Sequence, residues 1–251
     1  MKIAIASAAA LVAASSHGQI VIDDFDGGGV AAFNVSIDNS ANNGAFPSSG
    51  FDVFGITDRT VSFDFADDSA GSFPADEFGL AGTSKTDRFF GVADLSNNDN
   101  PGGTGSASWT LSIAGLSNLA VSIEFAAMGD FEAGDNSHTF TYSIDGAPAQ
   151  PLFTIDSRDD VDAFPYQMEG GAVVTIDDPL EVQGQGFITN SFNAFTASVI
   201  GSGSSLTINY EAGVNNGGFE PFAFDNLILI PTPASAALLG LGGLAAARRR
   251  R

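Results

Sequence analysis

The chain has 251 residues, and its 30 acidic residues against 9 basic ones give a formal net charge of −21. Lys2 and Arg248–Arg251 lie at the ends, so the central part of the chain is more acidic still. A body of this charge repels nucleic acid and anionic lipid, which excludes a nucleic-acid-binding protein. Since there is no cysteine, a disulfide framework, a cysteine zinc site and a cysteine nucleophile are excluded as well.

Residues 1–18 are predicted to be a cleaved signal peptide with a short helix. Lys2 supplies the positive start, Ile3–Ala14 is apolar, and small residues offer cleavage after Ala14 or before Gln19. An apolar stretch of this length is too short to span a bilayer but fits an export signal. A buried core helix would not explain the lysine or the polar residues that follow.

Residues 19–230 are predicted to form one all-β domain, a single two-sheet antiparallel β-sandwich that is jelly-roll-like. Short runs of alternating polar and apolar residues recur, separated by clusters of glycine, asparagine, aspartate and proline. We expect about a dozen strands at the spacing typical of sandwiches. The clearest runs are 60–66, 108–113, 119–125, 138–144, 206–210 and 222–230.

Phenylalanine dominates the aromatic residues, with 22 Phe against one Trp and three Tyr. Phenylalanines at alternate strand positions usually fill the space between two sheets. Trp109 shares its predicted face with Leu111 and Ile113, so we expect it in the core rather than on a sugar-binding platform.

The closing run 222–230 contains a carboxylate among apolar residues. Alternation places Phe222, Phe224, Asn226 and Ile228 on one face and Asp225 on the other with Leu227 and Leu229. Such a carboxylate needs a cation or hydrogen bonds. First and last strands often lie close in jelly rolls, which gives the hypothesis of a Ca²⁺ site with ligands from Asp23, Asp24, Asp26 and Asp225. In the alternative, Asp225 caps a turn and the other three are solvated.

The C-terminal residues 231–251 have three successive parts: Pro231, Thr232 and Pro233; an apolar stretch over 234–247; and Arg248, Arg249, Arg250 and Arg251. Proline cannot donate to a ladder and stops the preceding strand. A short hydrophobic helix is expected next, with the arginine cluster retained on the cytoplasmic side.

This order resembles the PEP-CTERM sorting signal of bacteria with an outer membrane, although Thr232 replaces the usual glutamate. The resemblance implies recognition by an exosortase-like processing enzyme and cleavage near the motif. It covers only the tail and implies sorting, not an activity of the body. A simple C-terminal membrane anchor is the alternative.

A second, softer resemblance concerns the body. The segment 86–132 is similar to modules of secreted and surface bacterial proteins. The closing residues 222–229 (FAFDNLIL) resemble the last strand of galactose-binding-like and carbohydrate-binding jelly rolls. Those folds mostly bind glycans or mediate adhesion, so the resemblance implies a glycan-binding or adhesive role without naming a ligand.

The usual catalytic constellations are missing from the sequence. His138 is the only histidine after the signal region, and a lone histidine at a strand start is expected at the surface or an edge rather than as a base. Neither a Gly-x-Ser-x-Gly elbow nor a phosphate-binding loop occurs. The segment 94–100 lacks the spacing of an EF-hand loop.

A glycosidase needs two carboxylates, and several acidic pairs occur in the sequence. They are expected to be solvated loop charges: Asp67 and Asp68, Asp76 and Glu77, Asp130 with Glu132 and Asp135, Asp159 with Asp160 and Asp162, and Asp177 and Asp178.

The sequence therefore favours an exported, non-enzymatic protein of the cell envelope or extracellular matrix. It would meet signal peptidase, be anchored transiently in the inner membrane by its tail, be processed, and reach the cell surface or matrix. A module that binds exopolysaccharide is the first alternative, and a secreted glycosidase the second. No catalytic residue is predicted.

Overall fold

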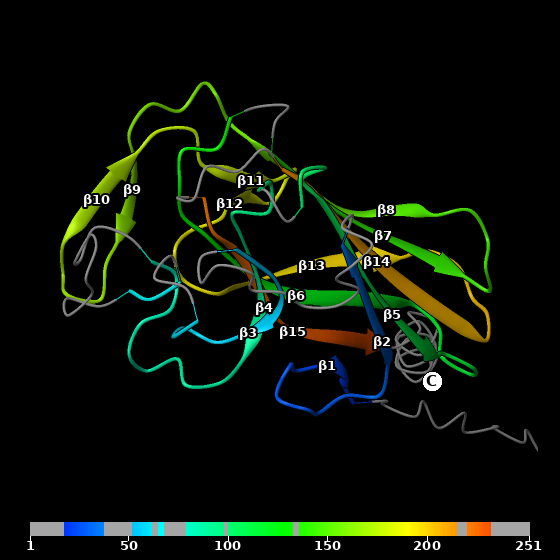
Figure 1. Cartoon of the computed structure of the whole chain (residues 1–251). Coiled ribbons are helices and arrows are strands. Elements are labelled where there is room, and N and C mark those ends of the chain that lie inside the picture. Colours follow the sequence, from blue (N-terminus) through cyan, green and yellow to red (C-terminus); the bar gives the residue numbers. More distant parts are fainter. Residues whose placement is uncertain are drawn as a thin grey trace, which may run out of the picture.

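The computed structural model describes residues 18–37, 52–61, 65–67, 79–97, 100–132, 136–214 and 220–231, where the regular structure consists of β-strands (Figure 1). Within these ranges no helix has the length and apolar character needed to cross a membrane. The helices expected at either end of the chain, with Thr232, Pro233 and the four arginines, lie outside the described residues.

Two antiparallel sheets form a sandwich, which confirms the predicted all-β class. One sheet has six strands in the order β13-β6-β15-β4-β3, with β1 also paired to β15. Its strands are β1 (Ile20–Asp23), β3 (Val53–Thr57), β4 (Phe89–Ala93), β6 (Leu119–Ala127), β13 (Asn193–Val199) and β15 (Phe222–Pro231).

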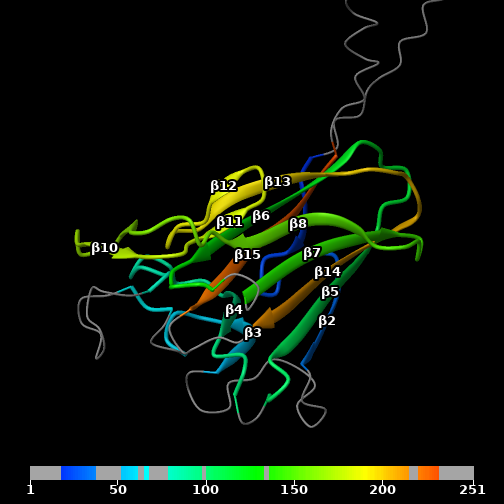
Figure 2. The same ribbon diagram turned by 90° about the horizontal axis from the view of Figure 1, so that it is seen from above.

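The other sheet has seven strands in the order β12-β11-β8-β7-β14-β5-β2. Figure 2 shows five of them, from β8 to β2, side by side as one layer. Its strands are β2 (Ala32–Ile37), β5 (Thr104–Ser112), β7 (Asn136–Ile144), β8 (Gln150–Ser157), β11 (Leu180–Val182), β12 (Gly186–Phe187) and β14 (Ser205–Val214). A separate hairpin consists of β9 (Phe164–Gln167) and β10 (Val173–Ile176).

The main core lies between the two sheets and is rich in aromatic rings, as the composition predicted. Trp109 is fully buried there with Phe90, Phe140, Tyr210 and Phe224. In β6 the predicted inward set of Leu119, Val121, Ile123 and Phe125 is buried. A second cluster covers the outer face of the six-stranded sheet, where residues of β9 and β10 pack against Phe89, Ala126 and Ala223. Both faces of this sheet are therefore partly buried.

The strand expected at residues 60–66 is not found in its described members. Thr60 and Val61 lie in a turn, and Ala66 makes only an isolated bridge with Ala81. Phe65 is nevertheless fully buried, in the second cluster. The alternating apolar residues of this segment therefore indicate burial against the outer face of the six-stranded sheet, not a β-strand.

The first and last strands pair antiparallel, with Ile20 opposite Leu229 and Val21 opposite Ile228. This confirms the expected closeness of the two ends of the body. A bulge between Asp225 and Ile228, with Asn226 at a φ of 50°, interrupts β15 and divides its edge between β4 and β1. The bulge also changes which side chains share a face.

Candidate ligand-binding surface

The outer face of the seven-stranded sheet is covered by short polar side chains. Along β5, β7 and β14 every second residue except Gly213 is Ser, Thr, Asn or Glu, and the residues between them enter the core. One cross-strand row runs over five strands and consists of Ser36, Ser106, Glu211, Thr139 and Thr154. We call this surface the hydroxyl face.

Neighbouring rows continue the pattern. Asn34, Ser108, Asn209 and Thr141 form the next row. Farther along, the hydroxyls of Thr110 and Thr207 are 3.0 Å apart and hydrogen-bonded. β-branched threonines suit a pleated surface, and paired hydroxyls satisfy each other across strands. The face is thus both structurally favourable and rich in donors and acceptors.

The hydroxyl face is hollowed where β2, β5, β14 and β7 lie side by side. The hollow has a volume of about 570 Å³, and its described lining consists of Ser36, Ile37, Thr104, Gly105, Ser106, Ser137, Thr139, Glu211, Ala212 and Gly213. Gly213 points outward by alternation, and its lack of a side chain leaves the floor of the hollow open. A Cβ at this position would lie only 3.1 Å from the Ser137 hydroxyl. Glu211 contributes the one charge of this described lining, which holds no aromatic side chain.

His138 lies directly beneath this hollow, on the core side of the sheet. It is paired with Ala212 across β7 and β14 and is fully buried, so the expectation of a surface or edge histidine is wrong. His138 lies at the same position of the alternation as Phe140 and Tyr142 in this strand, and that pattern indicates burial. Its Nδ1 lies 2.7 Å from the Tyr210 hydroxyl, and its ring stacks on Phe222.

Burial controls the protonation of this pair. It lowers the pKa of His138 to about 3 and raises the pKa of Tyr210 well above its usual range. The second ring nitrogen, Nε2, has no hydrogen-bond partner among the described residues. A neutral, buried histidine below the sheet supports the floor of the hollow but does not reach a ligand in it.

The carboxylates of the calcium hypothesis are engaged separately. Asp23 accepts hydrogen bonds from the Phe25 amide at 2.9 Å and from Trp109 Nε1 at 2.9 Å. Asp24 accepts hydrogen bonds from the backbone amides of Asp26 and Gly28 in its own loop. Asp26 accepts a hydrogen bond from the Arg88 amide at 3.0 Å. Burial raises the pKa of Asp23. Trp109 belongs to the core between the sheets, so Asp23 is turned to the inner face.

Asp225 faces the opposite side of the same sheet, because the bulge at Asn226 shifts the alternation. Leu227 and Leu229 join Phe222 and Phe224 in the core, and the predicted grouping of Asp225 with these leucines is wrong. The side chain of Asp225 is 1% exposed and contacts the ammonium of Lys85. Lys85 supplies the positive charge beside this carboxylate, and the side chains of Asp225 and Asp23 face opposite sides of the sheet.

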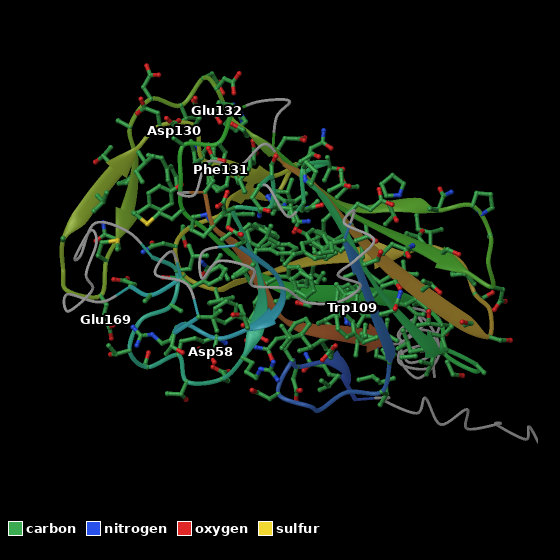
Figure 3. The ribbon with its side chains drawn as sticks, viewed as in Figure 1. Asp58, Trp109, Asp130, Phe131, Glu132 and Glu169 are labelled. Atoms are coloured by element: carbon green, nitrogen blue, oxygen red, sulfur yellow. The ribbon has the colours of Figure 1, made fainter. Side chains whose placement is uncertain are left out.

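Other acidic residues gather in loops. Asp130 and Glu132 flank Phe131 at the end of the molecule near β9 and β10 (Figure 3). Burial, followed by repulsion from Asp130 and from three further aspartates, Asp159, Asp177 and Asp162, raises the pKa of Asp178. Among the described residues, no group of three or more His, Cys, Asp or Glu side chains is placed to hold a metal ion. Asp68, Asp76, Glu77 and Asp135 lie outside them.

One carboxyl pair stands apart from these loops. Asp52 directly precedes Val53 at the start of β3, and Asp94 directly follows Ala93, the partner of Val53, at the end of β4. Burial, a hydrogen bond from carboxyl to carboxyl and repulsion from Asp52 raise the pKa of Asp94 to about 6. Asp94 therefore keeps its proton at pH values above the usual pKa range of an aspartate.

No protein-family model and no curated protein matches the chain. Solved structures with a similar fold include a cyclase from Fischerella sp. TAU in complex with 4-(1H-indol-3-yl)butan-2-one, 12% identical, covering 80% of this chain and 85% of that one with a TM-score of 0.40. The K3 adhesin domain of Lys-gingipain from Porphyromonas gingivalis is 10% identical, covers 79% and 98%, and has a TM-score of 0.33.

The family 11 carbohydrate-binding module of Clostridium thermocellum, solved with a mixed-linked tetrasaccharide, is 12% identical, covers 87% and 99%, and has a TM-score of 0.29. The assignment of a β-sandwich rests on the strand pairing of the chain itself. At these identities the likeness concerns architecture alone.

Proposed function

We propose that the chain is an exported, non-enzymatic protein of the cell envelope or extracellular matrix whose hydroxyl face binds a saccharide. The observation that carries this proposal is the hollow of about 570 Å³, in which β2, β5 and β7 supply hydroxyls and β14 supplies Glu211. Its volume is within the range of small-ligand sites. Hydroxyl side chains both donate and accept, which matches the alternating donors and acceptors of a sugar ring.

The charge of the site narrows the kind of saccharide. Glu211 is the only charged side chain of the described lining, and the chain as a whole is strongly acidic. An anionic polysaccharide would be repelled. A neutral or amine-bearing saccharide, held by hydrogen bonds along its edge rather than by stacking on aromatic rings, suits this surface.

The lining also supports a binding role over hydrolysis. A glycosidase of the common kind requires two carboxyl groups on either side of the scissile bond. The described lining supplies only one such group, Glu211.

Export and sorting complete the proposal. β15 ends at Pro231, opposite Leu119 of β6, so the paired residues that the structure describes all precede Thr232. Cleavage near that residue by an exosortase-like enzyme would leave the sandwich whole. Signal peptidase would act at the other end, before β1.

Saccharide binding is tested with a glycan array and titration calorimetry on the purified protein. We expect saturable binding to one class of neutral or amine-bearing glycan. Glu211→Gln should weaken it about tenfold, which corresponds to about 1.4 kcal/mol for a lost charge-assisted hydrogen bond. Gly213→Val should abolish it by filling the hollow.

Thr141→Val is the matched control, because Thr141 lies on the same face outside the described lining. It should bind like the unaltered protein. Equal binding by all variants would place the ligand elsewhere, and turnover of a polysaccharide panel would favour the glycosidase alternative.

Processing of the tail is tested by the intact mass of protein recovered from its native envelope. The mature chain should end near Thr232 and lack Arg248–Arg251. Recovery of the full C-terminus would favour a permanent anchor. In that case, deletion of the four arginines should impair membrane retention without changing the thermal unfolding of the body.

A further inference from the structure

The contact between Lys85 and Asp225 joins residues 140 positions apart in the sequence on the outer face of the six-stranded sheet. Asp225 lies in β15 and is 1% exposed, and the Lys85 side chain is 16% exposed. Lys85 is the only lysine after Lys2. The one lysine amine of the body therefore contacts the carboxylate oxygen of a buried aspartate.

The surroundings of this contact are largely apolar. The Phe192 ring lies 4.7 Å from the Lys85 Nζ, and Phe192 packs against the fully buried Phe89 with ring centres 5.4 Å apart. The neighbouring residue Ala223 belongs to the buried cluster on this face. Two opposite charges taken out of water in this way are costly unless their geometry compensates.

Two further carboxylates border the pair. Asp87 Oδ1 is 3.1 Å from the Lys85 Nζ, and its side chain is 47% exposed. Glu124 is the cross-strand neighbour of Asp225 on β6 and accepts a hydrogen bond from Asn226 Nδ2 at 3.0 Å. Asp87 therefore has direct access both to the amine and to solvent, while Glu124 and Asn226 hold the bulge in place.

We propose that Lys85 and Asp225 condense after folding into an intramolecular isopeptide bond. The Lys85 Nζ bonds to the Asp225 Cγ, and one Cγ–Oδ bond breaks. Two of the three ammonium protons leave with that oxygen as water, and the third remains on the amide nitrogen. The ammonium and the carboxylate disappear together, so the step needs no oxidant, reductant or second substrate.

Asp87 is the group that moves protons in this step. It takes a proton from the Lys85 ammonium to free the nucleophilic lone pair, and it returns a proton to the departing oxygen. The fold supplies proximity, since the two groups are already in contact and cannot diffuse apart. The reaction also removes two charges from an apolar setting, which favours the amide over the ion pair at this position.

The bond would close a loop that contains every strand from β4 to β14. In a chain without cysteine, this is a covalent constraint that export conditions cannot reduce. It ties the last strand to the segment before β4, so the unfolded chain could not separate them. The proposal is independent of saccharide binding, because the hydroxyl face belongs to the other sheet.

The intact mass of the denatured full-chain protein tests the bond directly. We expect a mass lower by one water than the sequence between the observed termini requires. Proteolysis should yield one branched peptide that joins Lys85 to Asp225. Amine-specific labelling under denaturing conditions should give the unaltered protein and Lys85→Arg the same number of labels, since the Lys85 amine has been consumed in the bond.

Variants separate the bond from an unreacted ion pair. The Lys85→Arg and Asp225→Ala variants should each have the full mass that their sequences require, without the loss of one water. Asp87→Asn should lower the cross-linked fraction, whereas Asp160→Asn, which removes an exposed partner of Arg158, should leave it unchanged. A full mass with a reactive Lys85 amine in folded protein overturns the proposal, as does a water loss that persists in Lys85→Arg.

Discussion

Lowering the pH from about 7 to about 4.5 is expected to cost about 3 kcal/mol of unfolding free energy through His138 alone. In the unfolded chain His138 binds a proton near its ordinary pKa of about 6.5. In the folded protein its pKa is lowered to about 3 by burial. Between these values the unfolded state binds more protons, so stability falls as the pH falls through this window.

The His138→Phe/Tyr210→Phe variant isolates this contribution. It removes both partners of the 2.7 Å hydrogen bond while keeping two rings of similar shape. Such a double replacement is expected to be close to neutral at pH 7, because no buried polar group is left unpaired. Urea unfolding at both pH values should then show a smaller loss for the double variant than for the unaltered protein.

The two single variants provide the controls. His138→Phe leaves the Tyr210 hydroxyl without its hydrogen-bond partner, and Tyr210→Phe does the same to the His138 Nδ1. Each single variant should therefore lose about 1–3 kcal/mol of unfolding free energy at pH 7. If the double variant loses as much stability on acidification as the unaltered protein, the acid sensitivity lies in the carboxylates and not in His138.

Replacement of Phe224 by alanine is expected to cost about 3–5 kcal/mol, a large part of the stability of an ordinary domain. Phe224 stacks on Phe90 with ring centres 4.6 Å apart and meets Tyr210 and Phe140 of the other sheet at 4.9 and 5.1 Å. Its removal leaves a cavity that rings from both sheets cannot close. Chemical unfolding followed by tryptophan fluorescence measures the loss, since Trp109 also contacts this ring.

Phe187→Ala is the matched control for this substitution. Phe187 lies in the edge strand β12 and is only half-buried beside Arg158. Its loss should cost clearly less than that of Phe224. Equal losses would mean that the core between the sheets is loosely packed and can relax around a missing ring.

Local alternation was sufficient to predict the sandwich and much of its core. The inward residues of β5, β6 and β7 followed directly from their parity, and so did the burial of Trp109. The same parity places His138 on the buried face with Phe140, whereas the polarity of its side chain favours an exposed position. For buried strands, position in the alternation is the stronger signal.

Features that depend on distant parts of the chain could not be predicted in this way. The bulge at Asn226 reverses the facing of every later residue in β15, and nothing local marks it except an asparagine that tolerates a positive φ. The pairing of Asp225 with Lys85 spans 140 residues. The hydroxyl face likewise appears only when β5, β7 and β14 become neighbours, although each shows its polar side in the sequence.

The antiparallel pairing of β1 with β15 has a mechanical consequence for a tethered protein. A pull on Pro231 acts along β15, while β6 holds one edge of that strand and β1 and β4 hold the other. The ladder hydrogen bonds lie across the direction of the pull, so they bear the load together rather than opening one at a time. Resistance to such a pull depends on the rate of unfolding rather than on equilibrium stability. The body would thus hold its shape under flow while fixed by the end of its last strand.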